Sequence, residues 1–186
     1  MTGVLSYSFI DREGKIIVEK DGGVPLMPAS NMKILTGIAA YKFLGEGHKL
    51  NTYFSMAGRD LLVSGGPSPL LTAAELEGLA QGIIKMGHEV NRIVIDNSIF
   101  DKNQYGPGWM IDDRKYTYQA KISPISVNEG CLPRGWKDAD LKDLPPAHTG
   151  ENLHPVQSQS RSFCNLLWKS LGKTGKPIYA IASDRL

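Results

Sequence analysis

The chain has 186 residues, a formal net charge of +2 and a hydrophobic content of 41%. This length suits one domain, or one domain with an insert, and the hydrophobic content is enough for a core. The nearly balanced charge argues against nucleic acid or an anionic membrane as the main partner. No apolar run reaches the ~20 residues that a membrane-spanning helix needs. We therefore expect neither a nucleic-acid partner nor a transmembrane segment.

Few residues in the sequence point to a cofactor or to a particular compartment. Residues 1–5 lack the charged and apolar regions of a signal peptide, so none is expected in this chain. Two cysteines, Cys131 and Cys164, are too few for a disulfide framework, and a single bridge or two unpaired thiols both remain open. The four histidines show no metal-ligand spacing. The sequence predicts no metal and no organic cofactor.

The first part of the chain predicts a hairpin followed by a helix. Residues 4–10 alternate apolar and polar side chains, as a half-buried strand does. A turn at 11–15 leads to the apolar residues 16–18, which complete the hairpin. The run 34–44 is apolar on nearly every side, which is typical of a buried helix, and Gly45 ends it.

The middle of the chain predicts a small α/β unit. Residues 50–56 and 61–64 are two extended segments joined by a turn. Thr72, with a glutamate three residues later, forms a capping box and predicts a helix over 72–86. The strand 92–96 follows, and this strand–helix–strand order is typical of an α/β insert.

The last third of the chain has less regular structure. Residues 123–128 predict a strand that enters a turn. The polar, aperiodic segment 130–155 predicts a surface loop or the scar of a missing subdomain. A helix over 156–171 and a strand over 178–182 are expected last.

Two further patterns give only weak signals for chemistry. Gly65 and Gly66 form a glycine pair, but no complete phosphate-binding loop follows, so nucleotide binding is not expected. Asp112 and Asp113 lie next to each other among aromatic residues. Paired carboxylates can perform acid–base chemistry, yet in a loop they are more often solvated or capping groups.

Ser30 and Lys33 are the strongest candidates for catalysis. They stand one helical turn apart at the start of the apolar helix, where side chains at i and i+3 are neighbours. A serine hydroxyl becomes a nucleophile when a base takes its proton, and a lysine can be that base. The alternative is that Ser30 is an ordinary N-cap and Lys33 a solvated residue. The same spacing recurs at Ser170 and Lys173, but a glycine inside that second copy indicates a helix end.

Five segments, taken in order, resemble one enzyme family. They are P-A-S-N-M-K at 28–33, L-V-S-G-G-P-S-P-L at 62–70, I-D-N-S-I-F-D at 95–101, G-P-G-W with D-D at 106–113, and S-P-I-S-V-N-E at 123–129. Together they resemble the serine D-Ala-D-Ala carboxypeptidases and endopeptidases of the class C penicillin-binding type. The second segment lacks the aspartate of that family's G-G-D-P-x-L pattern.

The resemblance implies a fold and a reaction. The fold is α+β, of the β-lactamase/transpeptidase-like D,D-peptidase type, incomplete in this chain and carrying a small α/β insert. Residues 1–57 would form its first part, 58–122 the insert, and 123–186 the return to the peptidase-like domain. The reaction would be acyl transfer from a D-Ala-D-Ala peptide or a β-lactam to Ser30, with Lys33 as general base, at the cell envelope outside the cytoplasm.

The sequence also departs from the family pattern. Enzymes of this type combine S-x-x-K with S-x-N and K-T-G elements. Ser126 and Asn128 supply the S-x-N letters and are the candidate substrate-binding pair, but their context matches a segment that precedes the catalytic S-x-N. Residues 173–175 supply the K-T-G letters in an unusual place, between a helix end and a strand.

These departures leave several interpretations open. We expect the chain to be the N-terminal portion of a longer enzyme rather than a shortened homologue, because an all-apolar helix needs more structure to cover it. The expected association is then with the missing C-terminal portion or with a second copy. The alternatives in function are a related serine hydrolase, such as a β-lactamase, an esterase or a D-aminopeptidase-like enzyme, and a catalytically silent peptide- or glycan-binding module.

Overall fold

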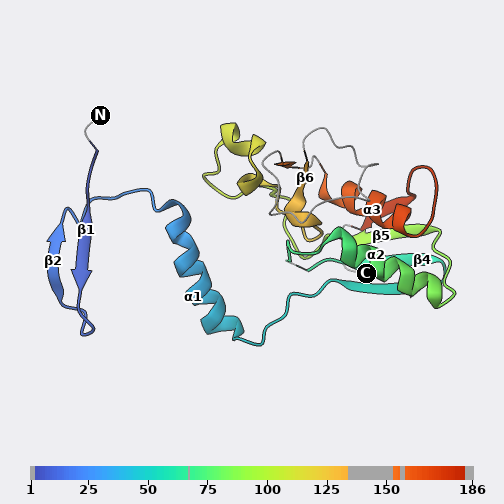
Figure 1. Cartoon of the computed structure of the whole chain (residues 1–186), viewed down its shortest axis with the longest axis horizontal. Coiled ribbons are helices and arrows are strands. Elements are labelled where there is room, and N and C mark those ends of the chain that lie inside the picture. The colour runs from blue at the N-terminus through green and yellow to red at the C-terminus, as the bar shows by residue number, and fades with distance from the viewer. Residues whose placement is uncertain (1–2, 67, 134–152, 156–157, 183–186) are drawn as a thin grey trace. The chain divides into compact units, whose positions relative to one another are not determined.

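The computed structural model describes residues 3–66, 68–133, 153–155 and 158–182 (Figure 1). The chain divides into two compact units, Met1–His48 and Lys49–Leu186, which are described separately below. The expected division into 1–57, 58–122 and 123–186 stays a prediction.

The first unit consists of the expected hairpin and helix. β1 (Tyr7–Ile10) pairs antiparallel with β2 (Ile16–Lys20). The Asp11 carboxylate closes the turn by accepting hydrogen bonds from two backbone N–H groups, those of Glu13 and Lys15. A short 3₁₀ helix, η1 (Ala29–Asn31), then leads directly into α1 (Met32–Leu44).

α1 is apolar all round, and nothing within its own unit covers it. In the described part of this unit no residue of α1 is buried, and the side chains of Ile34 and Phe43 are 63% and 78% exposed. A two-stranded hairpin is too small to cover a helix on all sides, so the burial expected for this helix would need further structure and stays a prediction.

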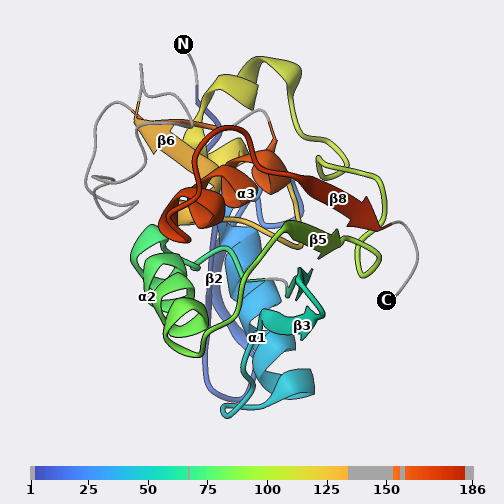
Figure 2. The ribbon, with the colours of Figure 1, turned by 90° about the vertical axis from the view of Figure 1, so that its right-hand side faces the viewer.

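The second unit is built on a four-stranded sheet in the order β3-β4-β5-β8. Its strands are β3 (Tyr53–Ala57), β4 (Asp60–Ser64), β5 (Arg92–Asp96) and β8 (Tyr179–Ala182). The β3–β4 pair is antiparallel, and β4, β5 and β8 run parallel to one another. Figure 2 shows β5 and β8 side by side and pointing the same way. The expected strands at 50–56, 61–64, 92–96 and 178–182 are thus confirmed, with small shifts at their ends.

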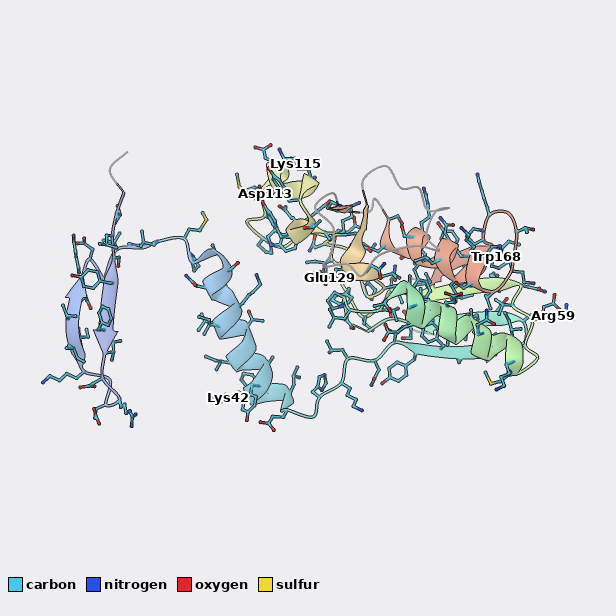
Figure 3. The ribbon with its side chains drawn as sticks, in the orientation of Figure 1. Lys42, Arg59, Asp113, Lys115, Glu129 and Trp168 are labelled. Carbon is cyan, nitrogen blue, oxygen red and sulfur yellow. The ribbon has the colours of Figure 1, made fainter. Side chains whose placement is uncertain are left out.

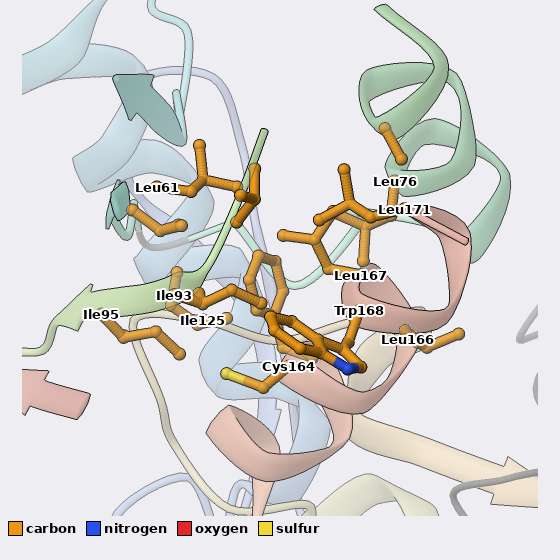
Figure 4. Packing of buried hydrophobic residues seen from close by; sticks show 14 of the residues in the cluster. Leu61, Leu76, Ile93, Ile95, Ile125, Cys164, Leu166, Leu167, Trp168 and Leu171 are labelled. Carbon is orange, nitrogen blue, oxygen red and sulfur yellow. The ribbon is translucent and has the colours of Figure 1, made fainter. Parts of the chain in front are cut away.

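Two helices complete the core of this unit. α2 (Ala73–Lys85) begins with the predicted capping box, in which Thr72 Oγ1 accepts from the Glu75 N–H and the Glu75 carboxylate accepts from the Thr72 N–H. α3 (Gln159–Ser170) carries Phe163 and Leu167, which are fully buried. Both helices pack with β4 and β5 in one hydrophobic cluster (Figure 4).

The segment between β5 and α3 differs from the expectation. Residues 123–128 form no strand; they lead instead into a 3₁₀ turn, η4 (Asn128–Gly130), because Asn128 and Glu129 take left-handed backbone conformations. The predicted loop 130–155 begins and ends in paired strands, β6 (Cys131–Pro133) and β7 (Leu153–Pro155), and its residues 134–152 lie outside the described part. Two more short helices, η2 (Ile111–Lys115) and η3 (Thr117–Gln119), lie in the aromatic segment.

Candidate active site

Ser30 and Lys33 form a hydrogen-bonded pair at the entrance to α1. Lys33 Nζ donates to Ser30 Oγ over 3.2 Å. η1 carries Ser30 and the first turn of α1 carries Lys33, so the i, i+3 spacing alone brings the two side chains together. The prediction that the Lys33 amine and the Ser30 hydroxyl lie next to each other is confirmed.

The backbone before the serine is strained. Ala29 has φ = 45°, in the left-handed region that non-glycine residues rarely adopt. Such a conformation costs about 1–3 kcal/mol and is found most often at functional sites. The left-handed conformation of Ala29 sets the direction of the backbone at the next residue, Ser30.

The first N–H groups of this helical segment are free of side-chain caps. Neither Pro28 before η1 nor Asn31 before α1 makes a side-chain cap hydrogen bond. Uncapped N–H groups at a helix start carry partial positive charge and favour negative charge close to them. An oxyanion formed beside Ser30 would therefore be stabilised at this position.

Ser126 and Asn128 lie in the second unit, where both side chains are buried. Asn128 Oδ1 accepts a hydrogen bond from the Ala73 N–H at the start of α2, over 3.2 Å. The Asn128 N–H donates to the Leu71 carbonyl over 2.8 Å. The asparagine thus joins the 128–130 turn to the amino end of α2, which is a structural contact.

The K-T-G letters at 173–175 form the turn that ends α3. The Lys173 N–H donates to the Trp168 carbonyl, and the Trp168 indole N–H donates to the Thr174 carbonyl over 3.4 Å. Lys173 Nζ lies 3.9 Å from Glu89 Oε1. These contacts, together with the left-handed Gly175, agree with the expected helix end at Ser170–Lys173.

The remaining weak signals have structural explanations. A Cβ on Gly65 would collide with the Pro124 carbonyl, and one on Gly66 with the Asn51 carbonyl, so close backbone packing requires both glycines. Asp112 and Asp113 stand in the first turn of η2, where carboxylates are favourable. Figure 3 shows Asp113 in the same segment as Lys115.

Neither cysteine takes part in a disulfide or in a reactive site. Cys131 and Cys164 are both free and buried. Burial raises the pKa of the Cys131 thiol to about 11 and that of the Cys164 thiol to about 12. Since the thiolate is the reactive form, both groups are protonated and unreactive near neutral pH.

One further polar site in the second unit corresponds to none of the predicted site residues. Asn97 and Ser98, at the end of β5, line a pocket together with residues at the start of α3. The two segments are far apart in the chain, so no local spacing indicates that they meet. Among the described residues, no three His, Cys, Asp or Glu side chains gather closely enough to hold a metal ion.

The family of the chain follows from comparison with known proteins. The family model described as "D-Ala-D-Ala carboxypeptidase 3 (S13) family" matches residues 10–160, which is most of the chain. The chain therefore belongs to this family, and the resemblance inferred from the five segments is confirmed.

Two curated proteins show the same relationship. The D-alanyl-D-alanine carboxypeptidase of Actinomadura sp. (strain R39) is 34% identical over 127 residues, covering 63% of this chain and 24% of the relative. The D-alanyl-D-alanine carboxypeptidase DacB of Haemophilus influenzae is 24% identical over 130 residues, covering 64% of this chain and 27% of the relative. The chain thus spans about a quarter of the length of these relatives.

A solved structure shares the fold. The crystal structure of penicillin binding protein 4 (dacB) from Haemophilus influenzae matches with a TM-score of 0.70 and 17% sequence identity. The match covers 94% of this chain and 52% of the solved chain. This likeness confirms the expected α+β fold of the D,D-peptidase type over the part that the chain covers.

No helix among the described residues is both long and apolar enough to cross a membrane.

Proposed function

We propose that this chain contributes the nucleophile of a serine-type D-Ala-D-Ala carboxypeptidase. The carrying observation is the 3.2 Å contact between Lys33 Nζ and Ser30 Oγ at the start of α1. The family membership and the names of the relatives support D-Ala-D-Ala peptides as substrates. By the same relationship, the site of action is the cell envelope, outside the cytoplasm.

The proposed reaction proceeds through an acyl-enzyme. Lys33 accepts the hydroxyl proton while Ser30 Oγ attacks the carbonyl carbon of the terminal peptide bond. The tetrahedral oxyanion is stabilised by the backbone N–H of Ser30 at the start of the helical segment. The C–N bond then breaks, D-alanine leaves with a proton, and water hydrolyses the ester to release the shortened peptide. A β-lactam would acylate the same hydroxyl because its strained amide offers an equivalent carbonyl.

The contacts of Asn128 and Thr174 favour a second candidate function. Asn128 Oδ1 is occupied by the amino end of α2, and the Thr174 carbonyl by Trp168. If residues 126–128 and 173–175 are structural, the chain by itself carries one of the three elements that such catalysis needs. A binding module that holds a peptide or glycan without turnover would then be the alternative.

Labelling with a fluorescent penicillin tests the proposal. We expect the chain to form a covalent, denaturation-resistant adduct, and Ser30→Ala to abolish it because the attacking oxygen is gone. Lys33→Met should lower the labelling rate by a factor of about 10²–10⁴, which is the usual contribution of a general base. The matched control is the double variant Ser170→Ala with Lys173→Ala, which removes the other S-x-x-K and should label normally.

The outcomes separate the candidate functions. Label on the wild type together with release of D-alanine from a D-Ala-D-Ala peptide supports the carboxypeptidase. Label without such release supports a related hydrolase, such as a β-lactamase or an esterase. An unlabelled wild type that still binds the peptide supports the silent module and overturns the assignment of Ser30.

A further inference from the structure

One residue breaks the right-handed path of the backbone immediately before the proposed nucleophile. Pro28 is right-handed, with φ = −74° and ψ = −20°, and Asn31 is right-handed as well. Ala29 lies between them with φ = 45°. Proline is favoured in the first turn of a helix and alanine is the best helix former, so local preference alone would make this residue right-handed. Ala29 therefore takes its conformation against the preference of the sequence.

The break matters because of what a preceding helical turn does to a hydroxyl. Helical side chains point back towards the previous turn, where a serine or threonine hydroxyl can donate to the carbonyl four residues earlier. Thr36 makes this contact within α1, since its Oγ1 donates to the Met32 carbonyl over 3.1 Å. If the helix extended back through Ala29, the equivalent acceptor for Ser30 would be the Leu26 carbonyl.

Ser30 makes no such contact. Its hydroxyl accepts from Lys33 Nζ over 3.2 Å, and among the described residues it donates to no backbone carbonyl. The two hydroxyls, Ser30 and Thr36, thus lie in one helical segment but in different states. The hydroxyl with a helical turn before it is bonded to the backbone, and the hydroxyl after the left-handed residue is left to the lysine.

The local structure holds Ala29 in its left-handed conformation. The Asn31 N–H donates to the Pro28 carbonyl over 2.9 Å and closes a four-residue turn with Ala29 and Ser30 at its centre. A positive φ at the first central position of a turn is usually filled by glycine, asparagine or aspartate. The proline ring fixes φ at residue 28, so rotation of that bond cannot relieve the strain.

We propose that Ala29 is a positioning residue for acyl transfer. Its left-handed backbone removes the helical turn before Ser30, so that the hydroxyl is kept from the preceding carbonyls and remains paired with Lys33. Ala29 acts through Ser30 and does not touch the reacting atoms. This inference rests on the proposed function, because it concerns the reactivity of the same serine.

Three substitutions at residue 29 separate backbone conformation from side-chain size. Glycine and asparagine tolerate a left-handed backbone, whereas leucine, which is about as large as asparagine, favours a helix. We expect Ala29→Gly and Ala29→Asn to be acylated by a fluorescent penicillin within about 3-fold of the wild-type rate, since the hydroxyl stays available. Ala29→Leu should lower the acylation rate constant by about 10- to 100-fold, as misplacement of a reacting group does.

The kinetics are resolved into two constants. The dissociation constant of the reversible penicillin complex should change by less than about 3-fold in all three variants, because the substitution acts on the hydroxyl, whereas general damage to the site would alter both constants. Ala57→Leu is the matched control, since it makes the same change at an exposed residue at the end of β3. It should be acylated like the wild type. Circular dichroism checks that every variant is folded.

The outcomes are decisive. Equal acylation rates in the three Ala29 variants overturn the proposal and leave Ser30 as the nucleophile. Equal losses in Ala29→Asn and Ala29→Leu overturn it as well, because size and not backbone conformation then matters. Backbone NMR chemical shifts of the wild type test the same point without a variant, since a right-handed φ at residue 29 contradicts the proposal. A wild type that takes up no label overturns the proposed function instead.

Discussion

Ser30 and Lys33 owe their contact to local geometry. A 3₁₀ turn followed by a helix places residues three apart on the same side, and the 3.2 Å contact needs no support from distant parts of the chain. The strained backbone of Ala29, next to Ser30, does not follow from local sequence, because no sequence pattern predicts an alanine in the left-handed conformation. Such strain persists only where the surrounding structure imposes it.

The buried thiol of Cys164 predicts a pH dependence of stability. Its native pKa of about 12 lies above the ordinary value of 9.0, so the unfolded chain loses this proton first as the pH rises. The stabilisation from the protonated thiol is complete below pH 9.0 and is lost as the pH rises towards about 12. We expect the free energy of unfolding to fall by about 1 kcal/mol between pH 8 and pH 10 from this group alone.

Urea unfolding at the two pH values measures this effect. Cys164→Ala removes the titrating group, so the variant should show a smaller decrease than the wild type over the same interval. Equal decreases in the two proteins would contradict the assignment of the effect to Cys164.

At the scale of elements, Asn128 couples a turn to a helix. Its side chain accepts from the first N–H of α2, and its own φ of 48° suits asparagine better than most residues. Figure 3 shows the neighbouring Glu129 in this turn. The S-x-N sequence at 126–128 therefore lies where η4 is hydrogen-bonded to the start of α2.

Substitution of Asn128 separates its structural role from substrate binding. We expect Asn128→Ala to lower the free energy of unfolding by about 1–3 kcal/mol, because it leaves a helix N–H unpaired and puts alanine in a left-handed conformation. Asn128→Asp keeps an acceptor oxygen and should retain most of the stability. Urea denaturation compares the two variants. Normal penicillin labelling of Asn128→Asp would agree with a structural role, whereas loss of labelling in a stable variant would favour a role in substrate binding.

At the scale of the whole molecule, the hydrophobic core belongs to the second unit. Its members come from strands β4 and β5, helices α2 and α3, and the segment 125–127, together with Val90 and Leu171. Phe54 of β3 stacks on Phe163 of α3, with ring centroids 6.3 Å apart, which ties the edge strand to the helix.

Shortening a buried side chain in this core should lower the free energy of unfolding substantially. Leu167 is 0% exposed, so Leu167→Ala should lower the free energy of unfolding by about 2–5 kcal/mol, through lost burial and the cavity left behind. Leu70 is 64% exposed, and Leu70→Ala should change stability by less than about 0.5 kcal/mol. Urea titration followed by circular dichroism compares the two. Similar losses for both variants would contradict the assignment of the core.

The sequence by itself determined what depends on near neighbours in the chain. The capping box at Thr72, the glycine after α1, the strands around 60–64 and 92–96, and the Ser30–Lys33 spacing follow from local propensity and periodicity. The five ordered segments pointed to the family in the same way, since each is a short local pattern.

Only the tertiary structure decided what depends on contacts between distant segments. Residues 123–128 form no strand, because Asn128 forms a hydrogen bond with the start of α2 instead of with a sheet. The tertiary structure explains Gly65 and Gly66, because their backbones pack closely against the backbones of Pro124 and Asn51. It also brought Asn97 and Ser98 to the start of α3 to form a polar pocket. The physical reason is that burial and hydrogen-bond pairing are settled by the whole arrangement of the chain, whereas helix and strand preferences are settled within a few residues.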